Sequence, residues 1–155
     1  MTHPLHPIIV HFPIALLSTA MFFEVLERAM KRDVLREAAT WLLGLGFLGA
    51  LAATASGILA EEAAEEAGVP ERAIETHELF AFATLAVFAT LLAIRWLQKK
   101  RRLPEFPGVF LAIGLVGVAL IGLTGYFGGD LVYRYGAGVE RPAPTSAAPA
   151  DHENP

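Results

Sequence analysis

Four long apolar stretches alternate with short polar ones along this chain. The apolar stretches cover residues 8–26, 38–60, 79–97 and 109–126. Each approaches or exceeds the roughly 17–25 residues that an α-helix needs to cross a bilayer. A soluble fold of this size would lack the polar surface to cover four such helices. The pattern therefore predicts an all-α fold, a transmembrane four-helix bundle in the lipid bilayer over residues 3–139.

The charges on the connections predict how the bundle is oriented. The second connection is rich in glutamate, whereas the first and third are basic. The basic residues are Arg28, Lys31, Arg32 and Arg36 in the first connection and Arg95, Lys99, Lys100, Arg101 and Arg102 in the third. Because short basic loops stay cytoplasmic, both termini and the acidic connection are expected outside. The localisation expected is a bacterial inner (cytoplasmic) membrane.

The acidic connection is predicted to be a helical hairpin and not a loop. Residues 61–67 continue the second helix, Gly68 supplies a C-terminal cap, and Pro70 opens the third helix. The hairpin would project about two helical turns beyond the membrane. Its glutamates form either a solvated face or a docking surface for a basic partner.

Composition narrows the chemistry that the chain can perform. Hydrophobic residues make up 54% of the chain and cysteine is absent. Without cysteine there are no disulfides, covalent c-type haem, thiolate iron–sulfur clusters or cysteine zinc sites. No phosphate loop, His-Glu-x-x-His, Ser-His-Asp arrangement or nucleic-acid module is visible. A cofactor would therefore be bound non-covalently, and no enzymatic reaction is indicated.

Histidines supply the candidate chemistry. The predicted topology places His3, His6, His11 and His77 at the outer boundary of the bundle. In one regular helix His6 and His11 would point about 140° apart, too far to share a small metal ion. Pro13 is expected to kink or start the helix, which would let His6 swing over the mouth of the bundle.

Three interpretations of these histidines remain open. In the first, His11 and His77 are axial ligands of haem b, with Tyr133, Arg134 and His6 near its propionates. In the second, a divalent metal such as zinc or copper is bound. Its ligands would be His6 or His11, together with His77 and Glu61. In the third, the histidines bond to backbone carbonyls or glutamates and the protein is a non-catalytic scaffold subunit.

Three further features of the sequence are attributed to helix packing, a local ion pair and disorder. Small residues on the second and fourth helices predict close helix packing, and the same faces suit a homo-oligomer or a flat cofactor. These residues are Gly46, Gly49, Ala50, Ala53, Gly57, Gly114, Gly117, Gly122 and Gly125. Glu24 is expected to pair with Arg28 one turn later. Residues 140–155 are predicted to be a disordered tail, and His152 within it is expected to have no role.

Several motifs resemble one bacterial membrane family, the domain of unknown function 2231 family. They are residues 5–16 (LHPIIVHFPIAL), 54–57 (TASG) followed by Glu61 and Glu62, 76–78 (THE) and 128–139 (GGDLVYRYGAGV). The resemblance covers roughly residues 3–139. Family members are four-helix membrane proteins, some fused to Rieske or cytochrome c domains. The resemblance implies electron transfer at the outer face, with His6, His11 and His77 as the residues concerned.

The function expected from these features is redox-associated. The chain would be a small b-type cytochrome or a similar subunit. Its acidic hairpin would receive a basic periplasmic electron carrier, in a contact that weakens with salt.

Overall fold

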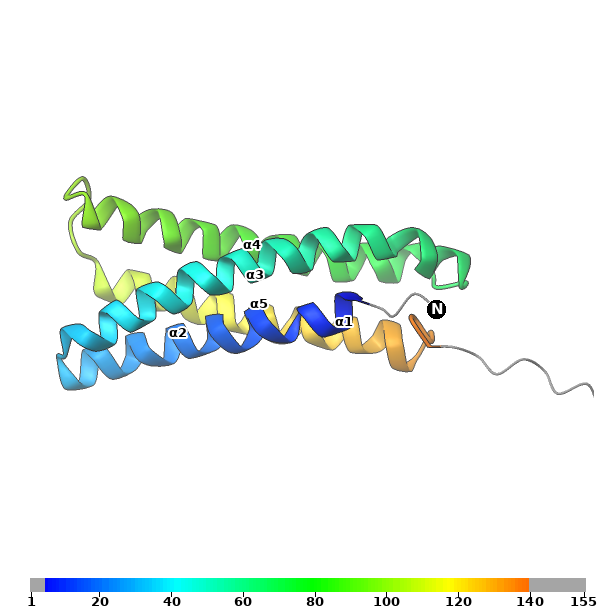
Figure 1. The fold of residues 1–155 in the computed structure, drawn as a ribbon, viewed down its shortest axis with the longest axis horizontal. Coiled ribbons are helices and arrows are strands. Elements are labelled where there is room, and N and C mark those ends of the chain that lie inside the picture. Colours follow the sequence, from blue (N-terminus) through cyan, green and yellow to red (C-terminus); the bar gives the residue numbers. More distant parts are fainter. Residues whose placement is uncertain (1–4, 140–155) are drawn as a thin grey trace, which may run out of the picture.

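The chain folds into a bundle of long antiparallel helices. The computed structural model describes residues 5–139, and within that range every regular element is a helix (Figure 1). The elements are α1 (Leu5–Ile9), α2 (His11–Met30), α3 (Asp33–Glu66), α4 (Glu71–Lys99) and α5 (Pro107–Tyr133). The predicted tail, residues 140–155, lies outside the described residues, as do His3 and His152.

Helices α1 and α2 form a single rod. Val10 lies between them with helical backbone angles, φ −61° and ψ −27°. The backbone N–H of Val10 donates to His6 O at 3.1 Å, and that of Ile14 donates to Val10 O at 3.3 Å. Leu5–Met30 therefore acts as one span, and the described chain has four helices long and apolar enough to cross a membrane. This confirms the predicted all-helical fold.

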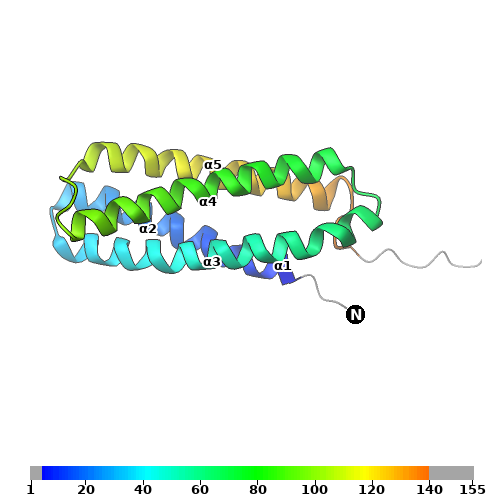
Figure 2. The same ribbon diagram turned by 90° about the horizontal axis from the view of Figure 1, so that it is seen from above.

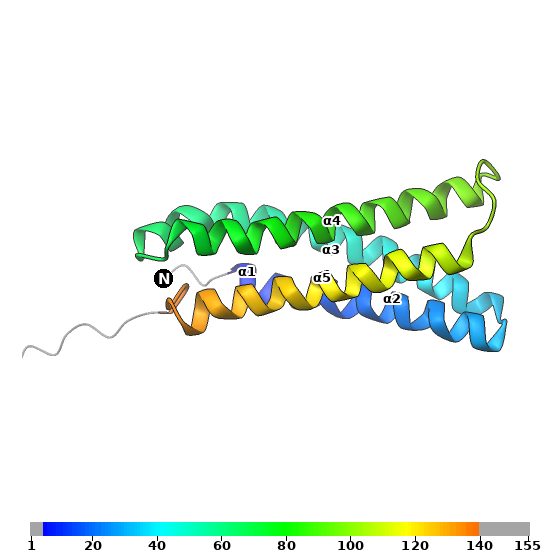
Figure 3. The same ribbon diagram turned by 180° about the vertical axis from the view of Figure 1, so that it is seen from behind.

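The start of α1, the α3–α4 turn and the end of α5 lie together at one end of the bundle, here called the terminal end (Figure 2). The α2–α3 turn and the α4–α5 loop lie at the opposite end, here called the basic end (Figure 3). The four spans thus run up and down in sequence order, which places two hairpins, α2–α3 and α4–α5, side by side.

The α3–α4 hairpin extends past its neighbours at the terminal end, as predicted (Figure 1). Helix α3 has 34 residues, a length of about 50 Å against a hydrocarbon core of about 30 Å. Gly68 ends this helix with φ 85°, and the N–H of Val69 donates to Ala64 O at 3.1 Å. The left-handed turn suits glycine and closes the hairpin tightly.

Only a narrow seam of the bundle is buried. Phe88, Leu17, Leu43 and Leu91 form its centre and are each at most 1% exposed. Many other large apolar side chains are exposed on the outer surface of the helices. In a membrane protein this surface faces lipid tails, so the apolar exposure fits the four spans.

Glycines allow the helices to approach closely in part of the seam. A Cβ added at Gly46 would lie 2.7 Å from Leu17 Cδ2, and one at Gly117 would lie 2.9 Å from Phe88 Cζ. Gly122 and Gly125 differ, because a Cβ there would meet nothing within 4 Å. The predicted small-residue packing therefore holds for the first half of α5 and not for these two positions.

Candidate functional site

Two imidazole rings face each other at the terminal end of the bundle. They belong to His6 on α1 and His77 on α4, and their centroids are 6.1 Å apart with the ring planes at 87°. Both residues are half-buried. The two rings come from different hairpins, because α1 precedes the first hairpin and α4 opens the second.

The surroundings of His6 fix which ring nitrogen carries its proton. Its Nδ1 lies 3.0 Å from Ala53 O and 3.0 Å from Ser56 Oγ, both on α3. Ser56 Oγ donates its own hydrogen to Ala53 O at 2.8 Å. Because a carbonyl oxygen only accepts, Nδ1 of His6 must be the donor, and Nε2 of the neutral ring keeps a free lone pair.

His77 is held in the same way by the other hairpin. Its Nδ1 donates to Thr124 O on α5 at 3.1 Å, which again leaves Nε2 as the unprotonated nitrogen. The hydroxyls of Thr84 and Thr124 lie 3.1 Å apart across α4 and α5. Each of these hydroxyls also bonds to its own helix, at Phe80 O and Leu120 O.

Bare backbone lies behind both rings. An added Cβ would lie 3.2 Å from His6 Cε1 at Gly57, and 3.0 Å from His77 Cε1 at Gly128. Both distances are tighter than a normal side-chain contact. Glycine at these two positions therefore makes the room in which the histidine rings sit.

Replacing Gly128 by valine is expected to push His77 out of place. The ring cannot retreat without breaking its bond to Thr124 O, so we expect a loss of roughly 1–3 kcal/mol in unfolding free energy. Gly125→Val is the matched control, because it lies on the same helix and meets open space. Unfolding by sodium dodecyl sulfate in mixed micelles measures both variants. Equal losses would contradict this role of Gly128.

His11 does not face His77, contrary to what the first interpretation expected. It is exposed, and its Nδ1 donates to Pro7 O at 2.6 Å on its own rod. The ring that faces His77 is that of His6. The physical reason is the continuous helix through Val10, which keeps His6 and His11 about 140° apart and turns only His6 inward.

The other predicted site residues do not join the pair. Within residues 5–139 no group of three or more His, Asp or Glu side chains is placed to hold a metal ion. Tyr133 is 93% exposed. Arg134 lies 3.9 Å from Asp130 and 5.6 Å from the Tyr135 ring centroid. Both residues lie at the end of α5, which is at the terminal end of the bundle, as the histidine pair is.

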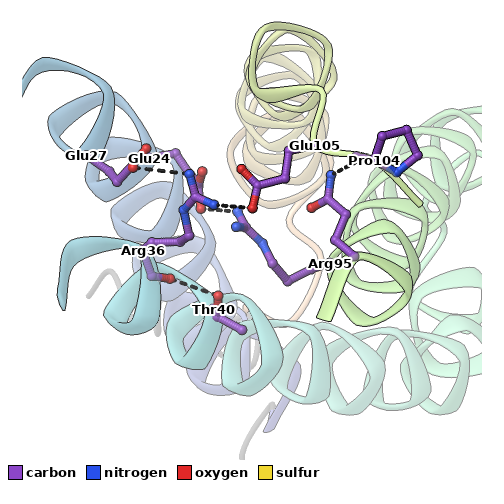
Figure 4. A network of polar contacts seen from close by, with 8 residues as sticks. Glu24, Glu27, Arg36, Thr40, Arg95, Pro104 and Glu105 are labelled. Atoms are coloured by element: carbon purple, nitrogen blue, oxygen red, sulfur yellow. Dashed lines mark hydrogen bonds and ion pairs between the residues drawn. The ribbon is translucent and has the colours of Figure 1, made fainter. Parts of the chain in front are cut away.

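A second polar cluster, which the sequence did not predict, lies at the basic end. Glu24 is 8% exposed and forms an ion pair with Arg95 of α4 (Figure 4). The Arg95 guanidinium also lies 4.2 Å from the Phe110 ring centroid. The predicted partner, Arg28, is exposed instead. The sequence did contain a signal for this ion pair. Glu24 and Arg95 both lie inside apolar stretches, at the same end of the predicted bundle, where a charged side chain needs a partner of opposite charge.

Arg36 extends this cluster towards the α4–α5 loop. Its guanidinium donates to Glu27 at 3.2 Å and to Glu105 at 2.7 Å (Figure 4). The two arginines thus connect α2, α3, α4 and the loop. Ion pairs therefore join the two hairpins at the basic end.

The sequence was compared with known proteins. The family described as predicted membrane protein (DUF2231) matches residues 2–141. Neither a curated protein nor a solved structure matches the chain. The match covers all the helices, the histidine pair and the ion-pair cluster, so this membrane protein belongs to the DUF2231 family.

Proposed function

We propose that this protein is a redox-associated membrane protein in which His6 and His77 would hold a b-type haem. The observation that carries the proposal is the apposition of the two rings, with centroids 6.1 Å apart, each holding its Nδ1 proton on a backbone carbonyl. His6 replaces His11 in the ligand pair expected from the sequence.

The two rings are close enough for one metal centre to be held by both, since their centroids are 6.1 Å apart. Their Nε2 atoms would hold it, because each Nδ1 bond to a carbonyl leaves Nε2 unprotonated. Bound haem iron would supply one-electron transfer. Gly57 and Gly128 make room for the two rings themselves, since a Cβ at Gly57 or Gly128 would lie 3.2 or 3.0 Å from a ring carbon.

The chain's own residues tune and orient this pair. The carbonyls of Ala53 and Thr124 accept the Nδ1 protons, which fixes the tautomer and makes each Nε2 a stronger ligand. In the proposal, Tyr133 and Arg134 at the end of α5 lie on the propionate side. The hydroxyl of Ser56 is a second acceptor for the Nδ1 proton of His6, whereas the Nδ1 proton of His77 has only Thr124 O.

The proposal includes an orientation and a partner. Basic connections at one end of the bundle support a cytoplasmic basic end in a bacterial inner membrane, with both termini and the histidine pair outside. The glutamate-rich tip of the α3–α4 hairpin would then meet a basic electron carrier. Opposite charges across such a contact speed association at low salt and lose effect as salt rises.

A reduced-minus-oxidised visible spectrum tests the haem directly. The full chain is purified in mild detergent from haem-replete cells, with His6→Ala, His77→Ala and His11→Ala prepared beside it. We expect sharp α and Soret bands in the parent and in His11→Ala, and their complete loss in the other two variants. His11→Ala is the matched control, because this exposed histidine is hydrogen-bonded to Pro7 O on its own rod.

A structural role for the pair is the second candidate. It is favoured by the hydrogen bonds themselves, since His6 ties α1 to α3 and His77 ties α4 to α5. In that case the parent is colourless, and the variants at His6 and His77 lose only about 1 kcal/mol of stability each. A colourless parent with stoichiometric copper or zinc would assign the pair to a metal ion instead.

A further inference from the structure

An open pocket of about 600 Å³ lies at the basic end, where α4 meets the α4–α5 loop. Its lining includes Lys99, Arg101 and Arg102. All three are exposed, and in the part of the chain that the structure describes none of them forms an ion pair. The pocket therefore gathers three cationic side chains without a protein counter-ion.

The one carboxylate in the lining, that of Glu105, is already paired with an arginine outside the pocket. Glu105 accepts a hydrogen bond from Arg36 of α3 at 2.7 Å. Its charge is thus directed to the ion-pair cluster between the helices and does little to neutralise the three cations. The pocket keeps a net positive charge.

The backbone at Arg101 is one that glycine would ordinarily adopt. Helix α4 ends with the N–H of Arg102 donating to Leu97 O and that of Arg101 donating to Gln98 O, each at 2.9 Å. Arg101 itself has φ 54°. Glycine is the usual residue in such a helix end because a side chain is strained there. This turn sets Arg101 next to Arg102 in the lining of the pocket.

The pocket lies at the level of lipid headgroups. Trp96 on the last turns of α4 is 55% exposed and Trp41 near the start of α3 is 68% exposed, both at the basic end. Exposed tryptophans of membrane helices prefer the boundary between tails and headgroups. Gln98 also donates to Pro104 O at 3.2 Å, which holds the loop against the end of α4.

We propose that this pocket binds the phosphate headgroup of an anionic phospholipid. Arginine and lysine clusters at the ends of membrane helices recognise such headgroups, and guanidinium groups match phosphate oxygens in pairs. Arg101 and Arg102 are the principal contacts, with Lys99 beside them. The assignment is independent of the histidine pair.

Brominated lipids provide the test, because bromine quenches tryptophan on contact. Trp41→Phe leaves Trp96 as the single tryptophan, since the chain has two. The full chain is reconstituted in phosphatidylcholine vesicles containing increasing fractions of brominated phosphatidylglycerol or brominated phosphatidylcholine. We expect phosphatidylglycerol to be preferred by about fivefold or more at Trp96.

Two double variants in the Trp41→Phe background separate the pocket from general surface charge. Arg101→Gln/Arg102→Gln should lower the preference to near parity. Lys31→Gln/Arg32→Gln is the matched control. Lys31 also has a left-handed backbone, with φ 52°, and the pair lies at the same end but does not line the pocket. This control should keep the preference.

Three results would overturn the lipid assignment. They are equal quenching by the two lipids in the parent, an equal loss in the two double variants, and loss of the preference on adding excess inorganic phosphate. Retention of the preference in excess phosphate supports the intact lipid as the ligand.

Discussion

Replacing Arg95 by leucine is expected to lower the free energy of unfolding by about 3–5 kcal/mol. The side chains of Arg95 and Glu24 are 12% and 10% exposed, so the substitution removes the guanidinium that contacts a buried carboxylate. Such a charge is costly because neither water nor lipid can solvate it there. Unfolding by sodium dodecyl sulfate in mixed micelles gives the measurement.

The double variant Glu24→Leu/Arg95→Leu shows whether the lost partner is the cause. Removing both charges together should recover most of the stability, since similar apolar side chains often replace a buried ion pair without loss. Arg28→Leu is the control for a lost positive charge at the same end, because Arg28 is exposed. It should change stability by less than about 0.5 kcal/mol. An Arg95→Leu variant as stable as Arg28→Leu would refute the argument.

Replacing Phe88 by alanine is expected to cost roughly 3 kcal/mol. Phe88 is fully buried at the centre of the seam, and its ring lies against the bare backbone of Gly117. In a membrane the cost comes from lost packing contacts and an empty cavity more than from exposure to water. The value therefore falls at the low end of the range for buried aromatic residues.

Phe82→Ala is the matched control for this substitution. It removes the same side chain from the same helix, but Phe82 is 47% exposed and faces outward. Its loss should cost well under 1 kcal/mol, because lipid fills the space that the ring leaves. Similar values for the two variants would mean that the seam at Phe88 is not the packed core of the bundle.

The helices and their order could be predicted from the sequence alone. Apolar length fixes a membrane-spanning helix, because an unpaired backbone cannot lie in lipid. The turn at Gly68 and the long α3–α4 hairpin were also predictable, since glycine and proline act locally on the backbone. These features depend on neighbours a few residues away.

Partners across the bundle were decided by the tertiary structure. Hydropathy places His6, His11, Glu24 and Arg95 at a depth but does not say which way each side chain points. The continuous rod through Val10 turned His6 towards His77 and His11 outward. The packing of the two hairpins brought Glu24 into an ion pair with Arg95 and not with Arg28. The physical reason is that apolar length fixes where a helix lies along the membrane normal, while its rotation is set only by close packing against other helices.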